Sequence, residues 1–280
     1  MFEVERHCGP TPRRLRETDL PDLVTLSTAA GWNQIEQDWL RLIRLVPEGC
    51  FGVELDGHIV ATTTAICYGR DLAWIGMVLT HPAYRRRGLA RALMEHALAW
   101  LDQQGVEWIG LDATEMGEPL YRSLGFEAEE SIERWAAQAP GHIAGEVLPV
   151  GFEAELDEQA YGVSRRVLLE HLAAGGSYRI RNVGYALWRP GRLAYALGPC
   201  IARTPEAAER LIRACLACRP GENWFWDLLP ANVAAVELAR HYGFTPRRHL
   251  VRMWRPGRAM RPRPRFRNEW IYATAGFEYG

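Results

Sequence analysis

Three arginines, a glycine and a small residue stand close together at Arg85, Arg86, Arg87, Gly88 and Ala90. Gly88 has no Cβ, so the backbone can turn tightly there and a bulky group can approach it. Amides at the start of a helix have no partner within it, and the helix dipole and the arginines make the local potential positive. These residue types and their spacing predict a binding site for a phosphate or pyrophosphate.

The residues on either side of this turn predict the elements that position it. Trp74 to Thr80 is an apolar run of strand length, and Pro82 cannot donate to a sheet, so the strand ends before it. From Leu89 onward apolar residues recur at helical spacing, and Gly105 is placed to cap the helix. The sequence thus predicts a strand, a tight turn with an anion site and an amphipathic helix, in that order.

This succession resembles the acyl-CoA site of the GNAT N-acyltransferases. The family signature, Q/R-x-x-G-x-G/A, is filled here by Arg85, Gly88 and Ala90. A second family motif, a short helix that ends in L-Y-x-x-x-G-F, is matched by the residues from Leu120 to Phe126. The resemblance implies acetyl-CoA as the co-substrate and no metal.

The resemblance also implies a role for each residue of these motifs. Amides of the turn and the first helical turn would hold the pyrophosphate of acetyl-CoA, at Arg85, Arg86, Arg87, Gly88, Leu89, Ala90 and Arg91. The pantetheine arm would pair with the strand edge at Val78, Leu79 and Thr80, where the Val78 amide would donate to the thioester oxygen. Tyr121 would be the general acid, because a phenol with a pKa of about 10 stays protonated at neutral pH and can donate to a thiolate.

The base and the acceptor site have weaker signals in the sequence. The central strand contains no carboxylate, so the nearest candidate bases are Asp112, at the end of the next strand, and Glu115 in the following loop. Asp112 is the candidate base among the side chains, with a helix cap as its alternative role, and an ordered water is the default base. For the acceptor we expect contacts from Trp32 and Asn33, in an aromatic and polar loop, and from the Asp227 carboxylate.

The second half of the chain repeats the first in outline, which predicts two domains. We expect a catalytic domain over residues 1–140, a linker rich in Gly and Pro over 141–150, and a degenerate domain over 151–280. Ala239 stands where the motif would require a tyrosine, and the run Ala202 to Glu206 offers no glycine for a phosphate. The predicted fold is α/β, with two GNAT-like domains, each a mixed, mainly antiparallel sheet flanked by helices. The final run, Ile271 to Gly280, is expected to pack back between them.

Composition limits the partners that the chain can have. The formal net charge of −1 argues against a general nucleic-acid binder, and no apolar run approaches the roughly 20 residues that span a bilayer. Together with the absence of a signal-peptide pattern, this predicts a cytoplasmic protein with no membrane partner. The six scattered cysteines favour buried thiols over a disulfide frame. The Arg/Pro segment from Trp254 to Arg267 is expected to be a solvated loop, or else a docking site for an acidic partner or nucleic acid.

The function that we predict is acyl-CoA-dependent N-acyl transfer, with acetyl-CoA as donor, to the primary amine of a small molecule in a ternary complex. Two alternatives stay open, an acyl-CoA sensor or scaffold without catalysis and a protein or peptide N-acetyltransferase. A homodimer is a further open alternative.

Overall fold

The structure, a computed structural model, describes residues 11–257 and 261–280. The strands of the first half are β1 (Arg13–Arg14), β2 (Cys50–Leu55), β3 (His58–Tyr68), β4 (Leu72–Thr80), β5 (Trp108–Ala113) and β6 (Glu127–Gln138). Its helices are α1 (Leu20–Ala29), α2 (Glu36–Leu45), α3 (Leu89–Gln104) and α4 (Glu118–Ser123), with short 3₁₀ turns at Glu17–Asp19 and Pro82–Tyr84.

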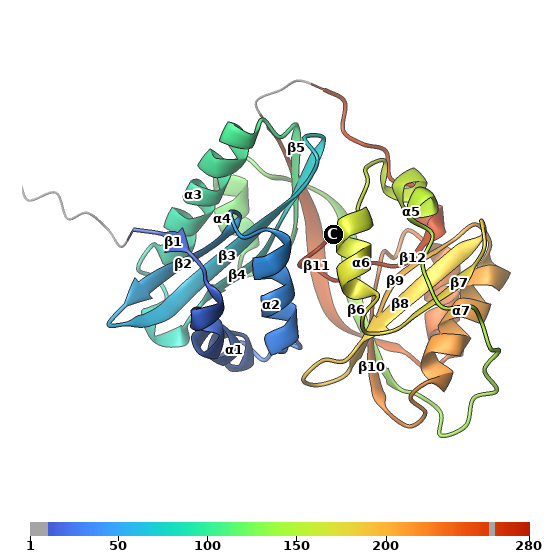
Figure 1. The fold of residues 1–280 in the computed structure, drawn as a ribbon. Coiled ribbons are helices and arrows are strands. Elements are labelled where there is room, and N and C mark those ends of the chain that lie inside the picture. Colours follow the sequence, from blue (N-terminus) through green and yellow to red (C-terminus); the bar gives the residue numbers. More distant parts are fainter. Residues whose placement is uncertain (1–10, 258–260) are drawn as a thin grey trace, which may run out of the picture.

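The second half has a similar succession of elements (Figure 1). Its strands are β7 (Ser177–Ile180), β8 (Gly184–Arg189), β9 (Tyr195–Ala202), β10 (Asn223–Leu228), β11 (Thr245–Pro256) and β12 (Ile271–Ala273). Its helices are α5 (Ala154–Tyr161), α6 (Arg166–Leu172), α7 (Pro205–Ala217) and α8 (Val233–His241), with a 3₁₀ turn at Asn268–Trp270.

Local sequence signals predict some of these elements with the bounds that the structure shows, and they miss other elements. The hairpin of β2 and β3 turns at Asp56 and Gly57, both with positive φ, as the sequence predicts. The sequence predicts one helix from Tyr161 to Ala173. In the structure α5 ends at Tyr161, because Gly162 adopts the left-handed conformation, and α6 begins only at Arg166. No periodicity predicted β11, which is rich in arginine.

The order of the strands in the sheet is equivalent in the two halves when it is read inward from either end. It is β2-β3-β4-β5-β11-β6-β10-β9-β8-β7, with β1 beside β2 and β12 beside β9. Each half therefore places its last long strand between strands of the other half, since β11 lies between β5 and β6 while β6 lies between β11 and β10. The expected boundary at residue 140 divides the sequence, but it does not divide the sheet.

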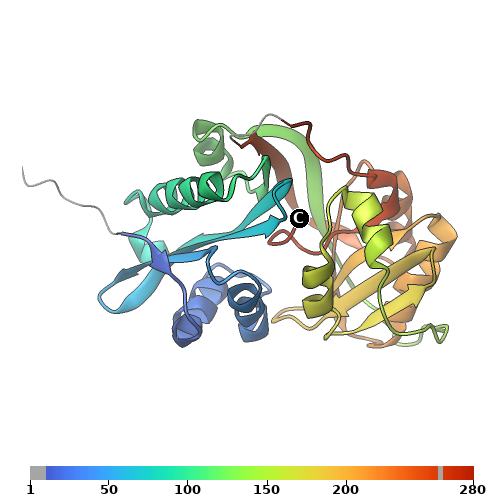
Figure 2. The ribbon, with the colours of Figure 1, turned by 45° about the horizontal axis from the view of Figure 1, so that its top comes forward.

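The sheet is mixed and mainly antiparallel, with helices on both faces, as predicted. Among the described strands, only the pairs β4·β5 and β9·β10 are parallel. Helices α1, α2, α5 and α6 share one buried cluster at the centre, whereas α3 covers a second cluster and α7 a third. Figure 2 shows α5 and α6 facing the first half across the C-terminal segment.

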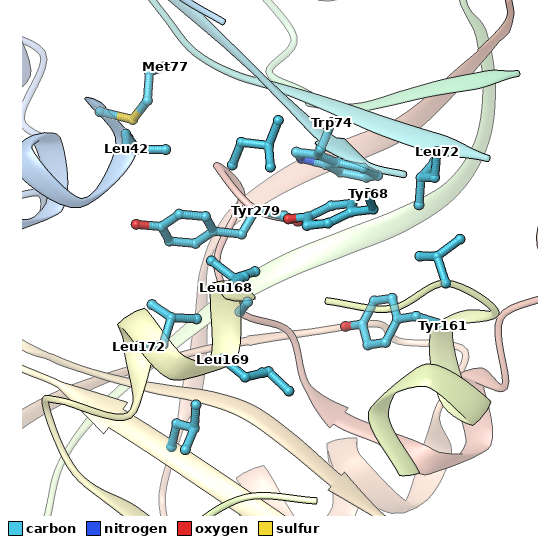
Figure 3. Close-up of a cluster of buried hydrophobic side chains, with 14 of the residues drawn as sticks. Leu42, Tyr68, Leu72, Trp74, Met77, Tyr161, Leu168, Leu169, Leu172 and Tyr279 are labelled. Atoms are coloured by element: carbon cyan, nitrogen blue, oxygen red, sulfur yellow. The ribbon is translucent and has the colours of Figure 1, made fainter. Parts of the chain in front are cut away.

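The final residues pack into the seam between the halves, as the sequence analysis expected. The Tyr68 hydroxyl donates to the Tyr279 carbonyl at 2.6 Å, and the Trp74 indole donates to the Phe277 carbonyl at 2.9 Å. Figure 3 shows the Tyr279 ring between Leu42 and the Leu168 of α6. The tail is thus part of the core that joins the two halves.

The Arg/Pro segment is only in part the solvated loop that was expected: residues 261–267 form no helix or strand, and Arg261, Pro262, Arg265 and Arg267 are exposed. Its first residues, Trp254 to Pro256, form the end of β11, and residues 258–260 lie outside the described part. Arg263 binds the Glu129 carboxylate, and the Arg261 carbonyl accepts from the Trp108 indole at 2.6 Å. Contacts with residues of the first half hold this segment in place. Such contacts cannot be inferred from composition.

Candidate functional site

Strands β4 and β5 open into a wedge. Their parallel pairing covers only three residue pairs, from Leu72 beside Trp108 to Trp74 beside Gly110. Beyond that point β4 has a bulge opposite β3, at which Met77 takes a φ of 50°. The Thr62 hydroxyl donates to the Met77 carbonyl at 2.8 Å and fixes the bulge. The bulge and the loss of pairing leave the end of β4 open on its β5 side.

A cavity of about 80 Å³ lies in this wedge. Four of the residues expected to form the site line it, namely Val78, Tyr121, Asp112 and Trp32. The remaining lining comes from both halves and from the tail: Gln34, Ile75, Gly76, Met77, Leu111, Thr114, Arg134, Arg248, Leu250, Phe277 and Glu278. The tertiary structure thus brings the strand before the anion turn and the short helix after β5 to one cavity.

The edge of β4 presents backbone donors to this cavity. The His81 amide donates to Val60 of β3 at 2.8 Å. Because successive amides of a strand point to opposite edges, those of Thr80 and Val78 point to the open side. The Leu79 side chain is 6% exposed and belongs to the central core, so its role is packing. The expected thioester contact at Val78 is compatible with this orientation.

The turn from Arg85 to Ala90 leads from β4 into α3 and has the predicted backbone geometry. Gly88 has a φ of 79°, and a Cβ placed there would meet no atom within 4 Å. Within the described residues, the amides from Arg86 to Arg91 donate to no protein acceptor. Arg87 lies over the Tyr84 ring, and Arg91 donates to the Ser123 hydroxyl at 2.8 Å. The last contact ties the start of α3 to α4, the helix that carries Tyr121.

Tyr121 is buried on α4 with its ring edge-on to Phe126. A Cβ on Gly117 would lie 2.8 Å from the Tyr121 ring, so that glycine leaves room for the tyrosine. The Tyr121 hydroxyl has no hydrogen-bond partner among the described residues and lies at the cavity. Burial raises the pKa of Tyr121 well above its usual value near 10. The phenol therefore keeps its proton and remains available as a donor.

Asp112 lies at the cavity but is engaged by an ion pair. Its two carboxylate oxygens accept from Arg252 at 2.9 and 3.1 Å, and both side chains are fully buried. Arg252 stands directly opposite Asp112 in the β11·β5 register. Each of the two oxygens thus already accepts one hydrogen bond from Arg252.

Asp227, an expected acceptor contact, occupies the corresponding place in the second half. Its carboxylate binds Arg134 through two contacts of 2.7 Å, and the two residues are opposite each other in the β10·β6 register. Because the two halves have equivalent strand orders, one buried Asp–Arg pair lies on each side of the central strands β11 and β6. Asp227 reaches the cavity only through Arg134, which lines it.

The two residues of the first loop have different roles. Trp32 lines the cavity beneath Arg248, whose guanidinium lies 5.8 Å from its ring centroid. Asn33 instead faces the other half of the chain, where its amide donates to the Ala194 carbonyl at 3.0 Å and its oxygen accepts from the Leu193 amide at 2.8 Å. Asn33 therefore fastens the loop that carries Trp32 to the β8–β9 connection.

The equivalent wedge of the second half is closed by the chain itself. Strand β12 pairs with the end of β9, and the Trp226 indole donates to the Tyr272 carbonyl at 2.7 Å. The Thr204 hydroxyl caps the first turn of α7 by accepting from the Ala207 amide. The Asn232 side chain caps α8 by accepting from the Ala235 amide. This half thus lacks both an open wedge and a free helix start.

The cavity residues that were not found from the sequence include Arg134, Arg248, Phe277 and Glu278. The arginines belong to strands exchanged across the seam, and Phe277 and Glu278 to the tail. The only signal in the sequence was the expectation that the tail packs between the halves.

Within the described residues, no cluster of three or more His, Cys, Asp or Glu side chains is suited to a metal ion. The described helices include none long and apolar enough to cross a membrane.

Comparisons with known proteins agree with this geometry. The model of the Acetyltransferase (GNAT) family matches residues 13–126, and that of the Acetyltransferase (GNAT) domain matches residues 154–273. An uncharacterized N-acetyltransferase of Methanocaldococcus jannaschii is 28% identical over 145 residues, which span 45% of this chain and 64% of that protein. This chain thus matches less than two thirds of that relative's length.

Solved structures resemble the whole chain. A proposed acetyltransferase from Pyrococcus horikoshii superposes with a TM-score of 0.82 at 21% identity, covering 100% of this chain and 99% of its own. A GCN5-related N-acetyltransferase from Sphaerobacter thermophilus has a TM-score of 0.64 at 15% identity and coverages of 89% and 97%. A tandem GNAT protein from the clavulanic acid biosynthesis pathway also has 0.64, at 14% identity and coverages of 90% and 99%. The chain therefore belongs to the GNAT acetyltransferase family, whose members are acyl-CoA-dependent, and consists of two GNAT domains in tandem.

Proposed function

We propose that the first half of the chain transfers the acetyl group of acetyl-CoA directly to the primary amine of a small molecule. The observation that carries this proposal is the cavity in the β4/β5 wedge. Val78 and Tyr121 both line it, while the unpartnered amides of α3 follow β4 after a short turn. A thioester at this place would have a donor for its oxygen on one side and a donor for its sulfur on the other.

Donor binding rests on backbone groups in this proposal. The amides from Arg86 to Arg91 would hold the pyrophosphate, helped by the helix dipole and by the arginine side chains. The pantetheine arm would lie along the open edge of β4 toward Val78. A backbone donor aimed at a developing oxyanion is typically worth about 2.7 to 4 kcal/mol of transition-state stabilisation.

The chemistry needs a protonated acid and an unprotonated amine. Tyr121 supplies the acid, since its raised pKa keeps the phenol protonated and its hydroxyl has no other described partner. An alkyl ammonium has a pKa of about 10.4, which is about 3 units above a pH of 7.4. Removing its proton at that pH therefore costs about 4 kcal/mol. Because Arg252 binds both oxygens of Asp112, we propose that water in the cavity accepts the proton of the ammonium. Asp112 then positions Arg252.

A small acceptor fits the cavity better than a peptide does. Its volume is about 80 Å³, and Trp32, Arg248 and Phe277 stand around it. The second half contributes Arg248 and Phe277 to this wall and has its own wedge closed by β12. In this proposal the second GNAT domain completes the acceptor site and does not bind acetyl-CoA.

The test is a free-thiol release assay with acetyl-CoA and a panel of amines, run beside Tyr121→Phe and Gly88→Glu. We expect Tyr121→Phe to lower kcat by about 100-fold or more with unchanged acetyl-CoA affinity. We expect Gly88→Glu to abolish acetyl-CoA binding measured by calorimetry. Gly243→Glu is the matched control, because Gly243 also has a positive φ, of 77°, and no atom within 4 Å of a Cβ. Binding of acetyl-CoA without turnover of any amine, amino acid, polyamine or peptide would favour the sensor function instead.

A further inference from the structure

The charged residues of the cavity are paired except for one. Four charged side chains line it, those of Asp112, Arg134, Arg248 and Glu278. Asp112 binds Arg252 at 2.9 Å and Arg134 binds Asp227 at 2.7 Å, while Glu278 and Arg189 are 3.2 Å apart. Within the described part of the chain, Arg248 has no ion-pair partner. The cavity wall thus carries one positive charge that has no ion-pair partner of its own among the described residues.

The position of Arg248 makes this charge costly. The residue is half-buried and stands opposite Arg134 in the β11·β6 register, where like charges repel. Burial, and then the charge of Arg134, lower the pKa of Arg248, and the Asp227 carboxylate offsets part of this shift. Its guanidinium remains charged at neutral pH, because the pKa of arginine is far above that range. An anion bound here would relieve the repulsion and replace the lost solvation.

We infer that the acceptor is an amine that also carries a carboxylate, an amino-acid-sized molecule whose carboxylate pairs with Arg248 in the wedge cavity. This inference rests on the proposed function and names the substrate class of the same site. A planar guanidinium matches a carboxylate through two parallel hydrogen bonds. Trp32 and Phe277 supply apolar walls for the carbon skeleton between the two ends.

The charge balance of the reaction favours the same class. An amine without an anion enters as a cation and adds to a cavity that is already positive. An amino acid enters as a zwitterion, and once its ammonium loses a proton it carries one negative charge, which complements Arg248. The neutral amine nitrogen forms a bond to the acetyl carbon, the carbon–sulfur bond breaks, and the sulfur takes a proton from Tyr121. The proton that the nitrogen loses as it becomes the amide passes through water in the cavity and restores the Tyr121 phenol.

The test compares each amino acid with its primary carboxamide, which keeps the amine and removes the negative charge. Pairs such as 5-aminopentanoate and 5-aminopentanamide have amines of similar pKa. We expect kcat/KM to be about 10- to 100-fold higher for the carboxylates, the size of a hydrogen-bonded charge pair. Arg248→Gln should remove this preference. Arg247→Gln is the control, because Arg247 is the neighbouring arginine and is exposed.

Two results would overturn the inference while the proposed function stands. One is equal turnover of carboxylates and amides, and the other is a preference that survives Arg248→Gln. A phosphonate accepted in place of every carboxylate would also overturn it. If no acceptor turns over, calorimetric titration of the same pairs into the acetyl-CoA complex decides. Carboxylate binding that is lost in Arg248→Gln supports the inference and places the failure in the proposed catalysis, whereas no such binding refutes the inference.

Discussion

The buried pair of Asp112 and Arg252 gives a sharp test of how the two halves are joined. Arg252→Met leaves the Asp112 carboxylate without its partner at a place where both side chains have 0% exposure. Removing one member of such a pair costs about 3 to 5 kcal/mol of unfolding free energy, because the remaining charge is buried and uncompensated. At about 2 to 4 °C per kcal/mol, the melting temperature should fall by about 6 to 20 °C. Scanning calorimetry measures this directly.

The double variant Asp112→Val with Arg252→Met distinguishes a lost pair from lost packing. Replacing both partners with apolar residues removes the uncompensated charge, so the double variant should recover most of the stability. Arg210→Met is the exposed control, since Arg210 and Glu146 pair with side chains 44% and 40% exposed and should change stability by less than about 1 kcal/mol. If the effects of the single variants simply add in the double variant, the pair does not couple and the argument is refuted. Because β11 crosses the seam, one cooperative transition is also expected, and two separate transitions would contradict the continuous sheet.

Three further predictions concern the site and the tail. Because burial raises the pKa of Tyr121, kcat/KM should rise with pH as the acceptor amine loses its proton, with no descending limb below pH of about 10, and a pH–rate profile that falls before this point would remove Tyr121 as the acid. Thr62→Val removes the hydroxyl that holds the Met77 carbonyl, so it should lower kcat more than it weakens acetyl-CoA binding in calorimetry, and an unchanged kcat would mean that the bulge is fixed by other contacts. Tyr279→Ala should cost about 3 to 5 kcal/mol in urea denaturation, because the ring is fully buried between the halves, and a loss below about 1 kcal/mol would show that the tail does not hold the seam.

Much of the site's position follows from short-range signals. The hairpin, the strand before Pro82, the turn at Gly88 and the helix that Gly105 ends were all predictable, because glycine, proline and apolar spacing act over a few residues. The same signals showed that the second half has no glycine for a phosphate and no tyrosine at Ala239. The sequence also indicated the GNAT family through two motifs in their order.

The partners of the charged residues could not be predicted in this way. Asp112 was expected to be a base and Asp227 an acceptor contact, yet each faces an arginine of a strand that comes from the other half. Asn33 likewise bonds to a loop more than 150 residues away. Strand β11 escaped prediction because its pattern is broken by arginines such as Arg252, which is buried only because Asp112 is opposite it.

The sequence by itself therefore determined the elements of the first GNAT domain, the glycine turn at the start of α3 and the absence of such a turn in the second domain. Only the tertiary structure decided how the two domains exchange strands, which carboxylates are free, and that Arg248, Phe277 and Glu278 line the cavity. The physical reason is the range of the interactions. A turn or a helix depends on neighbours along the chain, whereas strand exchange and buried ion pairs depend on contacts between residues far apart, whose energies appear only when the sheet is assembled.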